Sequence, residues 1–572
     1  MLTLKHIFDI NNISIKTAFI FFSVLLSFYF LQAQSIPSSV PGWVDKAVFY
    51  EIYPQSFNDA NGDGIGDIRG IINKLGYVKS LGVTAIWLNP FYQSPFRDAG
   101  YDVSDYYKVA ARYGNMDDVK ELFYKAHKLG LRVIIDFVPG HTSIDHPWFK
   151  ESAKVEKNKY SNWYIWTNST WNDGGDAKGR GMINGYSQRD ANFMINFFWH
   201  QPALNFGFGE PDSTQRWQLP TNHPDILAMR AEMKKILRYW LNAGCDGFRV
   251  DMAGSIIRKD KNGEGFKFWQ EVKQMLSTDY PNAFMVSEWS SPVDAIKAGF
   301  TADFLHWIPE YDNLFRREAN RSLNNVSANG NSWFDVKGKG DIEAFMKAYQ
   351  TQYDGVKGKG FISLPVGNHD LSRINVDRTD EELELIYAFQ FCMPGIPFIY
   401  YGDEIGMKQL YNRPAIEGCY PPRAGARTPM QWNNSKNLGF SKASASKLWL
   451  TPDTTYNAPN VFLQEKNANS LLNKTKKIIN MRNKQLALEA DADFTILYAA
   501  KDKYPFVFLR EKAGEKVLVA LNPSGRNVEV DIGLKLEGST MLLGNSKVTH
   551  APSKPGSKLI MKGVSYAVFK VL

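Results

Sequence analysis

The sequence predicts an α/β protein whose largest part is a (β/α)8 TIM barrel, with an inserted subdomain and a C-terminal β-sandwich. Two observations predict the barrel: short apolar runs alternate with segments of helical periodicity, and polar residues follow the ends of these runs. Repeated strand-helix units imply a parallel sheet, and eight units over this length favour closure. A doubly wound open sheet is the alternative architecture for the same pattern.

Eight apolar runs are the expected strands of the barrel. In chain order they are residues 48–53, 84–88, 131–138, 247–251, 283–287, 302–305, 361–367 and 396–401. Helical spacing is clearest at 68–81, 116–129, 225–243 and 381–392, and the first three of these helices are expected to stop at a glycine.

Two regions depart from the strand-helix alternation. Residues 143–222 are rich in Trp, Asn, Gly and Asp, and an insertion of that length is expected to form a subdomain over the site. After residue 475, alternating runs bounded by Gly, Asn and Pro predict an antiparallel β domain. The predicted division is 1–34 signal peptide, 35–142 and 223–474 barrel, 143–222 subdomain B, and 475–572 β-sandwich.

The first 34 residues have the pattern of a secretory signal. A positively charged start precedes an apolar run of 14 residues, Ala18 to Leu31, which is shorter than the roughly 20 that span a membrane. An uncleaved anchor is the alternative. We expect an exported protein, periplasmic or secreted, with no membrane span in the mature chain.

Charge and cysteine content exclude several classes of protein. The net charge of +8 is spread along 572 residues without a basic block carrying interleaved aromatics, so nucleic acid is not an expected partner. The cysteines, Cys245, Cys392 and Cys419, lack metal-binding spacing and allow one disulfide at most. Buried free thiols are the expectation for the first two, and the oligomeric state stays open.

Three carboxylates follow expected strands and are candidates for chemistry. Alternation in a strand points Arg249 and Asp251 to the same side, where the cation would keep the carboxylate ionised. Glu288, beside Trp289, has a more apolar setting in which a carboxyl group can hold its proton. Retaining glycoside hydrolysis needs one carboxyl group of each kind, about 5–5.5 Å apart. The alternative is that these residues and Asp370 only form ion pairs at strand ends.

Four short segments in order resemble the signatures of the α-amylase superfamily, glycoside hydrolase family 13. They are Asp136–Thr142, Gly247–Asp251, Ser287–Trp289 and Val366–Asp370, and the resemblance extends over about residues 43–570. It implies a (β/α)8 barrel, a subdomain after the third strand and a C-terminal β-sandwich. It also implies roles for six residues: Asp251 as nucleophile, Glu288 as general acid/base, Asp370 as third carboxylate, and Arg249, His141 and His369 around the sugar.

The segment Asp98–Asp102 is similar to the first-subsite segment of the oligo-1,6-glucosidase and α-glucosidase branch. This resemblance implies that Tyr101 stacks on the sugar ring and that Asp98 binds its far hydroxyls. Arg427 is similar to the arginine that closes the pocket floor with that aspartate, which would make the enzyme exo-acting. A plain structural ion pair is the alternative for Arg427.

The loop Asp59–Asp67 alternates oxygen-bearing side chains with glycines, a pattern that suits a hard cation. It resembles the calcium loop of the same branch, although Gly70 stands where an EF-hand has glutamate. We expect a structural Ca²⁺ held by Asp59, Asn61, Asp63, Asp67 and the carbonyl of Ile65; a metal-free glycine turn is the alternative. Gly140 replaces the superfamily's usual asparagine, so a calcium site at that position is not expected.

The expected function is a retaining α-glycoside hydrolase acting on maltooligosaccharides or isomaltooligosaccharides through a covalent glycosyl-enzyme intermediate. An exo-acting α-glucosidase is the preferred interpretation. The alternatives are an endo-acting α-amylase, a trehalose-synthase-like glucosyl transferase or isomerase, and a non-catalytic protein resembling transporter heavy chains. Met252, which follows the nucleophile, leaves the linkage preference open.

Overall fold

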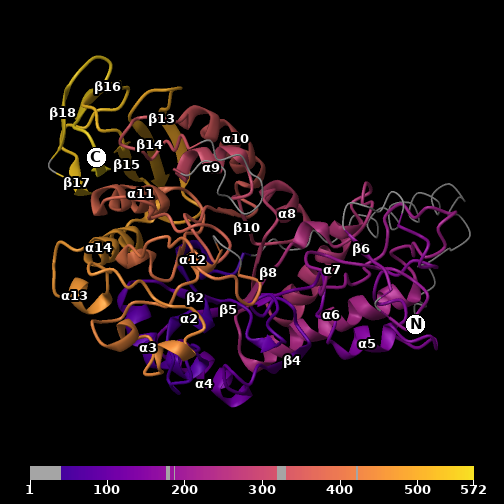
Figure 1. Ribbon diagram of the computed structural model, residues 1–572. Helices are drawn as coiled ribbons and strands as arrows, with labels where there is room; N and C mark the ends of the chain where they lie inside the picture. The colour runs from indigo at the N-terminus through magenta and orange to yellow at the C-terminus, as the bar shows by residue number, and fades with distance from the viewer. Residues whose placement is uncertain (1–39, 175–180, 186, 318–329, 420–422, 546) are drawn as a thin grey trace, which may run out of the picture. The chain divides into compact units, whose positions relative to one another are not determined.

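The computed structural model describes residues 40–174, 181–185, 187–317, 330–419, 423–545 and 547–572 (Figure 1). Its largest sheet contains eight parallel strands in the order β11-β10-β9-β8-β5-β2-β1-β12. A backbone hydrogen bond of 3.1 Å from Ile396 N to Ile362 O joins the two ends of this order. The predicted barrel is therefore confirmed. Its strands are β1 Phe49–Ile52, β2 Ala85–Leu88, β5 Arg132–Phe137, β8 Gly247–Val250, β9 Phe284–Ser287, β10 Ala302–Phe304, β11 Phe361–Ser363 and β12 Phe398–Tyr400.

Helices follow most of the strands, and local sequence explains where several begin and end. Capping boxes start α4 at Asn115 and α11 at Thr379, and α6 ends at Gly244 with φ of 116°. The helices outside the subdomain are α2 Pro54–Phe57, α3 Ile68–Ser80, α4 Met116–Lys128, α6 Pro224–Ala243, α7 Glu264–Asp279, α8 Pro292–Ala298, α9 Pro309–Phe315, α10 Ile342–Val356, α11 Asp380–Cys392, α12 Arg423–Ala426, α13 Val461–Glu465 and α14 Leu471–Lys484.

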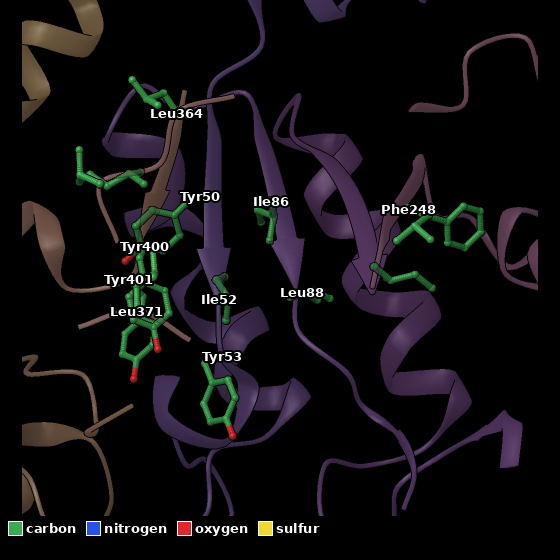
Figure 2. Packing of buried hydrophobic residues seen from close by; sticks show 14 of the residues in the cluster. Tyr50, Ile52, Tyr53, Ile86, Leu88, Phe248, Leu364, Leu371, Tyr400 and Tyr401 are labelled. Atoms are coloured by element: carbon green, nitrogen blue, oxygen red, sulfur yellow. The ribbon is translucent and has the colours of Figure 1, made fainter. Parts of the chain in front are cut away.

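Side chains alternate between two buried layers along each strand. Phe49, Trp87 and Phe284 belong to a cluster that fills the barrel interior, where the Phe49 and Phe398 rings stack at 4.4 Å. Their neighbours along the strands, such as Tyr50 and Ile86 in Figure 2, join the larger cluster that includes helix side chains. This two-residue period decides which polar residues of the barrel face inward.

The region between β5 and α6 has a small core of its own. Its regular elements are α5 Pro147–Ser152 and the short pair β6 Met182–Ile183 and β7 Phe193–Met194. Ile165, Met194, Ala203, Phe208 and Trp217 form its buried cluster. Backbone bridging between His141 and Ala203 attaches this region to the end of β5. A second hairpin, β3 Tyr92–Gln93 with β4 Asp105–Val109, lies in the loop after β2.

The C-terminal strands form two antiparallel sheets around one apolar cluster. They are β13 Asp493–Tyr498, β14 Phe506–Lys512, β15 Glu515–Asn522, β16 Val528–Ile532, β17 Thr540–Gly544, β18 Val548–Pro552, β19 Ser557–Met561 and β20 Ser565–Val571. The expected boundary after residue 474 falls inside α14, which packs against α11. The strand series therefore starts at Asp493.

The structure bears on two expectations, one about membrane-spanning helices and one about cysteine pairing. Among the described residues no helix is long and apolar enough to cross a membrane, and the expected signal, residues 1–34, lies outside the described part. All three cysteines are buried and unpaired, as expected for Cys245 and Cys392.

Candidate active site

The inward-facing series of β5, β8 and β9 becomes polar toward the carboxyl end of the barrel. Asp136 pairs in register with Arg249 on β8, and Asp251 and Glu288 follow the inward positions of β8 and β9. The expectation that Arg249 and Asp251 share a side is met, because Nη1 lies 2.8 Å from Asp251 Oδ1. The strand period thus gathers acidic groups around one cation.

Arg249 is almost completely buried and binds three carboxylates. Its Nη1 lies 2.8 Å from Asp136 Oδ1 as well as from Asp251, and its Nη2 lies 2.6 Å from Glu288 Oε2. Burial alone would lower the pKa of Arg249, but the charges of Asp136 and Glu288 outweigh it and raise the pKa. The guanidinium therefore holds the two candidate catalytic carboxyl groups in fixed positions.

The acidities of the two carboxyl groups differ from the expected division. Burial raises the pKa of Asp251 well above its usual value, despite Arg249. Burial also acts on Glu288, but the charge of Arg249 and the N–H of Trp307 outweigh it and lower the pKa. Besides burial, the like charges of Glu288 and Asp136 raise the pKa of Asp251. The carboxylate of Glu288 also accepts from more donors, namely Arg249, Trp307 and the Met252 backbone, whereas Asp251 accepts from Arg249. The site thus favours a proton on Asp251 over one on Glu288.

Asp370 lies in a second cationic group across the cavity. Its Oδ1 is 3.0 Å from Arg423 and 2.9 Å from Arg427, and its Oδ2 is 3.1 Å from His369 Nε2. Burial would raise the pKa of Asp370, but the charges of Arg423 and His369 hold it well below the usual value. Asp370 is therefore ionised.

His369 is enclosed by acidic and hydroxyl groups. Nδ1 contacts Glu51 at 2.7 Å, and Nε2 contacts the Tyr101 hydroxyl at 2.6 Å. Although burial opposes the charge, Asp370 and Glu51 raise the pKa of His369 to about 9. The Tyr101 ring stacks on the imidazole at 5.3 Å, so His369 covers one face of the ring expected to stack on sugar.

The arginine expected at the pocket floor is in a different place. The completely buried Arg427 donates to Asp370, to the His369 carbonyl and to Cys419, and no ion pair with Asp98 occurs in the part of the chain described. Arg423 contacts Asp98 at 3.8 Å as well as Asp370. The prediction that Arg427 pairs with Asp98 is therefore wrong. Arg423, which lies one helical turn earlier, makes the contact with Asp98 at the pocket floor instead.

Gln201 completes the floor by donating to Asp98 Oδ2 at 2.7 Å. Asp98 and Gln201 lie in two separate loops and Arg423 begins α12, so only folding brings the three together. The cavity above them has a volume of ≈550 Å³. It is lined by Asp98, Tyr101, His141, Phe197, Asp251, Met252, Gly254, Ser255, Glu288, Trp289, Trp307, Asp370 and Arg423.

His141 lines this cavity and is oriented by the subdomain. Its Nδ1 is 3.0 Å from the Asn196 amide, and its Nε2 is 3.2 Å from the Tyr101 carbonyl. A side chain at Gly140 would have its Cβ 2.7 Å from Asn196 Nδ2. Glycine at this position therefore makes room for Asn196, an arrangement that the sequence pattern did not reveal.

The loop expected to bind calcium is closed by its own hydrogen bonds. Asp59 accepts from the backbone of Gly62 and Gly64, and Asp67 accepts from Ala60 and Gly70. Asn61 and Asp63 bond to one another, and Ile65 N donates to Asp63. One oxygen of Asp59 and one of Asp67 already accept two hydrogen bonds each. The other oxygen of each, and both oxygens of Asp63, accept one and keep acceptor capacity that suits Ca²⁺ chemically. Over the described residues, however, no group of three or more His, Cys, Asp or Glu is arranged to hold a metal.

A barrel with three carboxylates at its carboxyl end defines the class of protein. Residues 51–491 match the family described as "Alpha amylase, catalytic domain", which covers more than half of the chain. The chain belongs to this family, glycoside hydrolase family 13, and is a glycosidase of the α-amylase type.

The chain is also similar to individual relatives and to a solved structure. It is 32% identical to an oligo-1,6-glucosidase of Parageobacillus thermoglucosidasius over 537 residues, 84% of this chain and 90% of that protein. It is 30% identical to the trehalose synthase/amylase TreS of Mycolicibacterium smegmatis over 495 residues, 80% and 78% of the two chains. The trehalulose synthase MutB of Pseudomonas mesoacidophila has the same fold, with a TM-score of 0.76, 24% identity, and coverage of 93% and 100%.

Proposed function

We propose that the protein is an exo-acting α-glucosidase that hydrolyses short α-gluco-oligosaccharides with retention. The observation that carries the proposal is the floor in which Gln201, Asp98, Arg423 and Asp370 are joined by contacts of 2.7, 3.8 and 3.0 Å. Charged and amide groups that converge at one end of the cavity suit the hydroxyls of a terminal glucose. Similarity to an oligo-1,6-glucosidase supports the same assignment.

The attachment of Asp251 and Glu288 to one guanidinium supports a retaining mechanism. Retaining enzymes hold their carboxyl groups about 5–5.5 Å apart, and inverting enzymes hold them at about 6.5–9.5 Å to admit water. The Oδ1 of Asp251 is held by Arg249, which leaves Oδ2 to attack the anomeric carbon. For this step the proton must lie on Glu288, so sugar binding has to move it from Asp251 to Glu288.

The decisive experiment is a profile of products and anomers on maltose, isomaltose, trehalose, maltotetraose and starch. NMR should show initial release of α-glucose, and disaccharides should be cleaved faster than starch. Asp251→Asn and Glu288→Gln should each lose about 10²–10⁴ in kcat, while Glu310→Gln on α9 should match the parent enzyme. An initial β-anomer, or full activity in Glu288→Gln, would contradict the proposal.

A variant at the floor tests exo action separately. Arg423→Ala removes the cation that joins Asp98 and Asp370, so the terminal sugar should bind less tightly. We expect KM for disaccharides to rise at least tenfold, and activity on starch relative to maltose to increase. A uniform fall on all substrates would show that Arg423 does not set chain-length preference.

A second candidate activity is glucosyl transfer or isomerisation. The aromatic side chains of Phe197, Trp289 and Trp307 line the cavity beside the carboxylates, and such surfaces suit a sugar acceptor. The similarity to a trehalose synthase/amylase agrees with this possibility. Isomeric disaccharides accumulating from maltose at high concentration would identify it.

We also propose that the chain is exported and that Asp59–Asp67 binds a structural calcium ion. The pattern of residues 1–34 supports export, and the oxygen donors of the loop support the ion. N-terminal sequencing of protein recovered outside the cytoplasm would test the first proposal.

A further inference from the structure

The candidate general acid is held by a tryptophan from the neighbouring strand end. Trp307 lies just after β10, and its indole Nε1 donates to Glu288 Oε1 at 3.0 Å. The other oxygen of Glu288, Oε2, accepts from Arg249 Nη2 at 2.6 Å and from the Met252 backbone N–H at 3.3 Å. The two oxygens of this carboxylate therefore have different surroundings.

The number of acceptor positions left free on each oxygen decides which oxygen of Glu288 can carry a proton. A carboxylate has about four acceptor positions, two on each oxygen. On Oε2 both are taken by N–H donors, whereas on Oε1 Trp307 takes one and leaves the other. Arginine and indole N–H groups are donors only, so neither can accept the proton. The open position on Oε1 is the one from which a proton can pass to a sugar in the cavity.

We propose that Trp307 is a positioning residue for the general acid, which makes Oε1 of Glu288 the proton-carrying oxygen and stabilises the charge left there. This inference rests on the proposed glycosidase function. As Asp251 Oδ2 bonds to the anomeric carbon, the glycosidic C–O bond breaks and the Oε1 proton passes to the departing oxygen. The indole N–H then faces a full negative charge, and a hydrogen bond to a charged group is stronger than one to a neutral group. In the second half, water bonds to the anomeric carbon, returns a proton to Glu288 and releases Asp251.

The surroundings of Trp307 keep its indole in place. Its backbone N–H donates to Ser290 Oγ at 3.0 Å, and Ser290 Oγ donates to the Phe304 carbonyl at 3.1 Å. Ser290 follows Glu288 by two residues, so it links the loop that carries the acid to the loop that carries the tryptophan. The ring of His306 packs 4.3 Å from the indole, is 2% exposed, and has no hydrogen-bond partner on either nitrogen among the described residues.

His306 supports the indole without adding a charge beside Glu288. Burial lowers the pKa of His306 to about 4, so the ring is neutral at the pH at which glycosidases of this kind would work. The groups whose charges reach His306 are Glu288, Arg249, Asp370 and His369. The ring packs against the indole, while Arg249 and the Trp307 N–H are among the groups that lower the pKa of Glu288.

Trp307→Phe tests the proposal because it keeps an aromatic ring and removes the N–H. With the best α-glucoside substrate, kcat/KM should fall about 10- to 100-fold, as expected for losing one hydrogen bond to a charged group. With α-glucosyl fluoride, whose leaving group needs no proton, the loss should stay under about threefold. The basic limb of the pH profile of kcat/KM should shift to higher pH by about one unit. The reason is that the carboxylate of Glu288 loses a donor that favours its charged form, so its pKa rises.

Trp289→Phe is the matched control. Trp289 also lines the cavity next to Glu288, but its N–H is not among the donors of that carboxylate in the described structure. This variant should leave the basic limb in place. Ser290→Ala, which frees the backbone of Trp307, should shift the limb in the same direction by a smaller amount and serves if Trp307→Phe does not fold.

The outcomes separate the inference from the function on which it rests. Equal losses on both substrates with an unmoved basic limb, in Trp307→Phe or in Ser290→Ala, would assign Trp307 a packing role and overturn the inference. A parent enzyme that cleaves neither an α-glucoside nor α-glucosyl fluoride would instead overturn the proposed function.

Discussion

At the scale of single residues, the ionisation of each carboxylate in the site depends on the cationic groups that pair with it. Arg249 serves three carboxylates, and Arg423, Arg427 and His369 together serve Asp370. An unpaired charge at such depth would cost several kcal/mol. Replacing any of these cations therefore changes the ionisation of its carboxylates before it changes the shape of the cavity.

The raised pKa of His369 predicts a pH-dependent stability. Its pKa of about 9 in the folded protein exceeds the value of about 6.5 expected when unfolded. The folded state therefore binds more protons between these values, and the contribution of His369 is complete below about pH 6.5 and lost as pH rises through about 9. Urea unfolding at several pH values should show the free energy of unfolding falling over this window.

His369→Gln should remove much of that fall, since the amide cannot take up a proton. Glu51→Gln should reduce it, because Glu51 is one of the groups that raise the pKa. An undiminished slope in His369→Gln would show that other groups produce the pH dependence.

At the scale of elements, strands β5 and β8 carry Asp136 and Arg249, and the segments that follow the strands carry most of the other site residues. Helix α12 places Arg423 in the cavity and is followed by Arg427, buried behind it. The end of β9 and the loop after it bind to β10 through Asp303, which accepts from Ser287 Oγ at 2.6 Å and from the Ser291 backbone N–H at 2.8 Å. Such cross-links between loops make the positions of Glu288 and Trp307 depend on one another.

The stability of the Asp59–Asp67 loop should depend on Ca²⁺. If Ca²⁺ binds there, removing it leaves the carboxylates of Asp59, Asp63 and Asp67 in one short loop without the cation, and their repulsion should loosen the start of α3. Treatment with a chelator should lower Tm by several degrees, and added Ca²⁺ should restore it.

Asp63→Asn with Asn61→Ala is the variant that separates calcium binding from general effects of the chelator. Its Tm should already be low and should not respond to chelator or Ca²⁺. A parent protein whose Tm is the same in chelator and in Ca²⁺ would favour the metal-free glycine turn.

At the scale of the whole molecule, the C-terminal sheets are fastened to the barrel helices by buried arginines. Arg510 of β14 is fully buried; it donates to the Cys392 carbonyl at the end of α11 and to the Glu489 carbonyl, each at 2.7 Å. Arg482 of α14 similarly donates to the Phe391 and Gly395 carbonyls. These contacts satisfy backbone carbonyl groups in the buried interior.

Arg510→Met should therefore destabilise the protein although it keeps a long apolar stem. Leaving two or more buried carbonyls unsatisfied is expected to cost about 3 kcal/mol or more. Arg526→Met is the control, because Arg526 is exposed and makes a longer contact of 3.3 Å to the Gly338 carbonyl. Thermal and urea unfolding should show a large loss for the first variant and about 0.5 kcal/mol or less for the second. Equal losses would mean that Arg510 does not join the domains.

The sequence by itself determined the barrel and the β-sandwich, and it indicated three carboxylates just past expected strands. These features are local: a two-residue period, a glycine after a helix and a carboxylate just past a strand depend on neighbours in the chain. Arg249 and Asp251 could be placed on one side for that reason. The four short segments around β5, β8, β9 and β11 then indicated the family.

Tertiary structure alone decided which side chains meet across the cavity. Arg423 rather than Arg427 reaches Asp98, Asn196 occupies the space beside Gly140, and Trp307 donates to Glu288. Each contact joins loops from different strand ends, and its distance depends on how those loops pack. Tertiary structure also decides the protonation of Asp251 and Glu288, because the number of N–H donors around a carboxylate is set by folding and not by its neighbours in sequence.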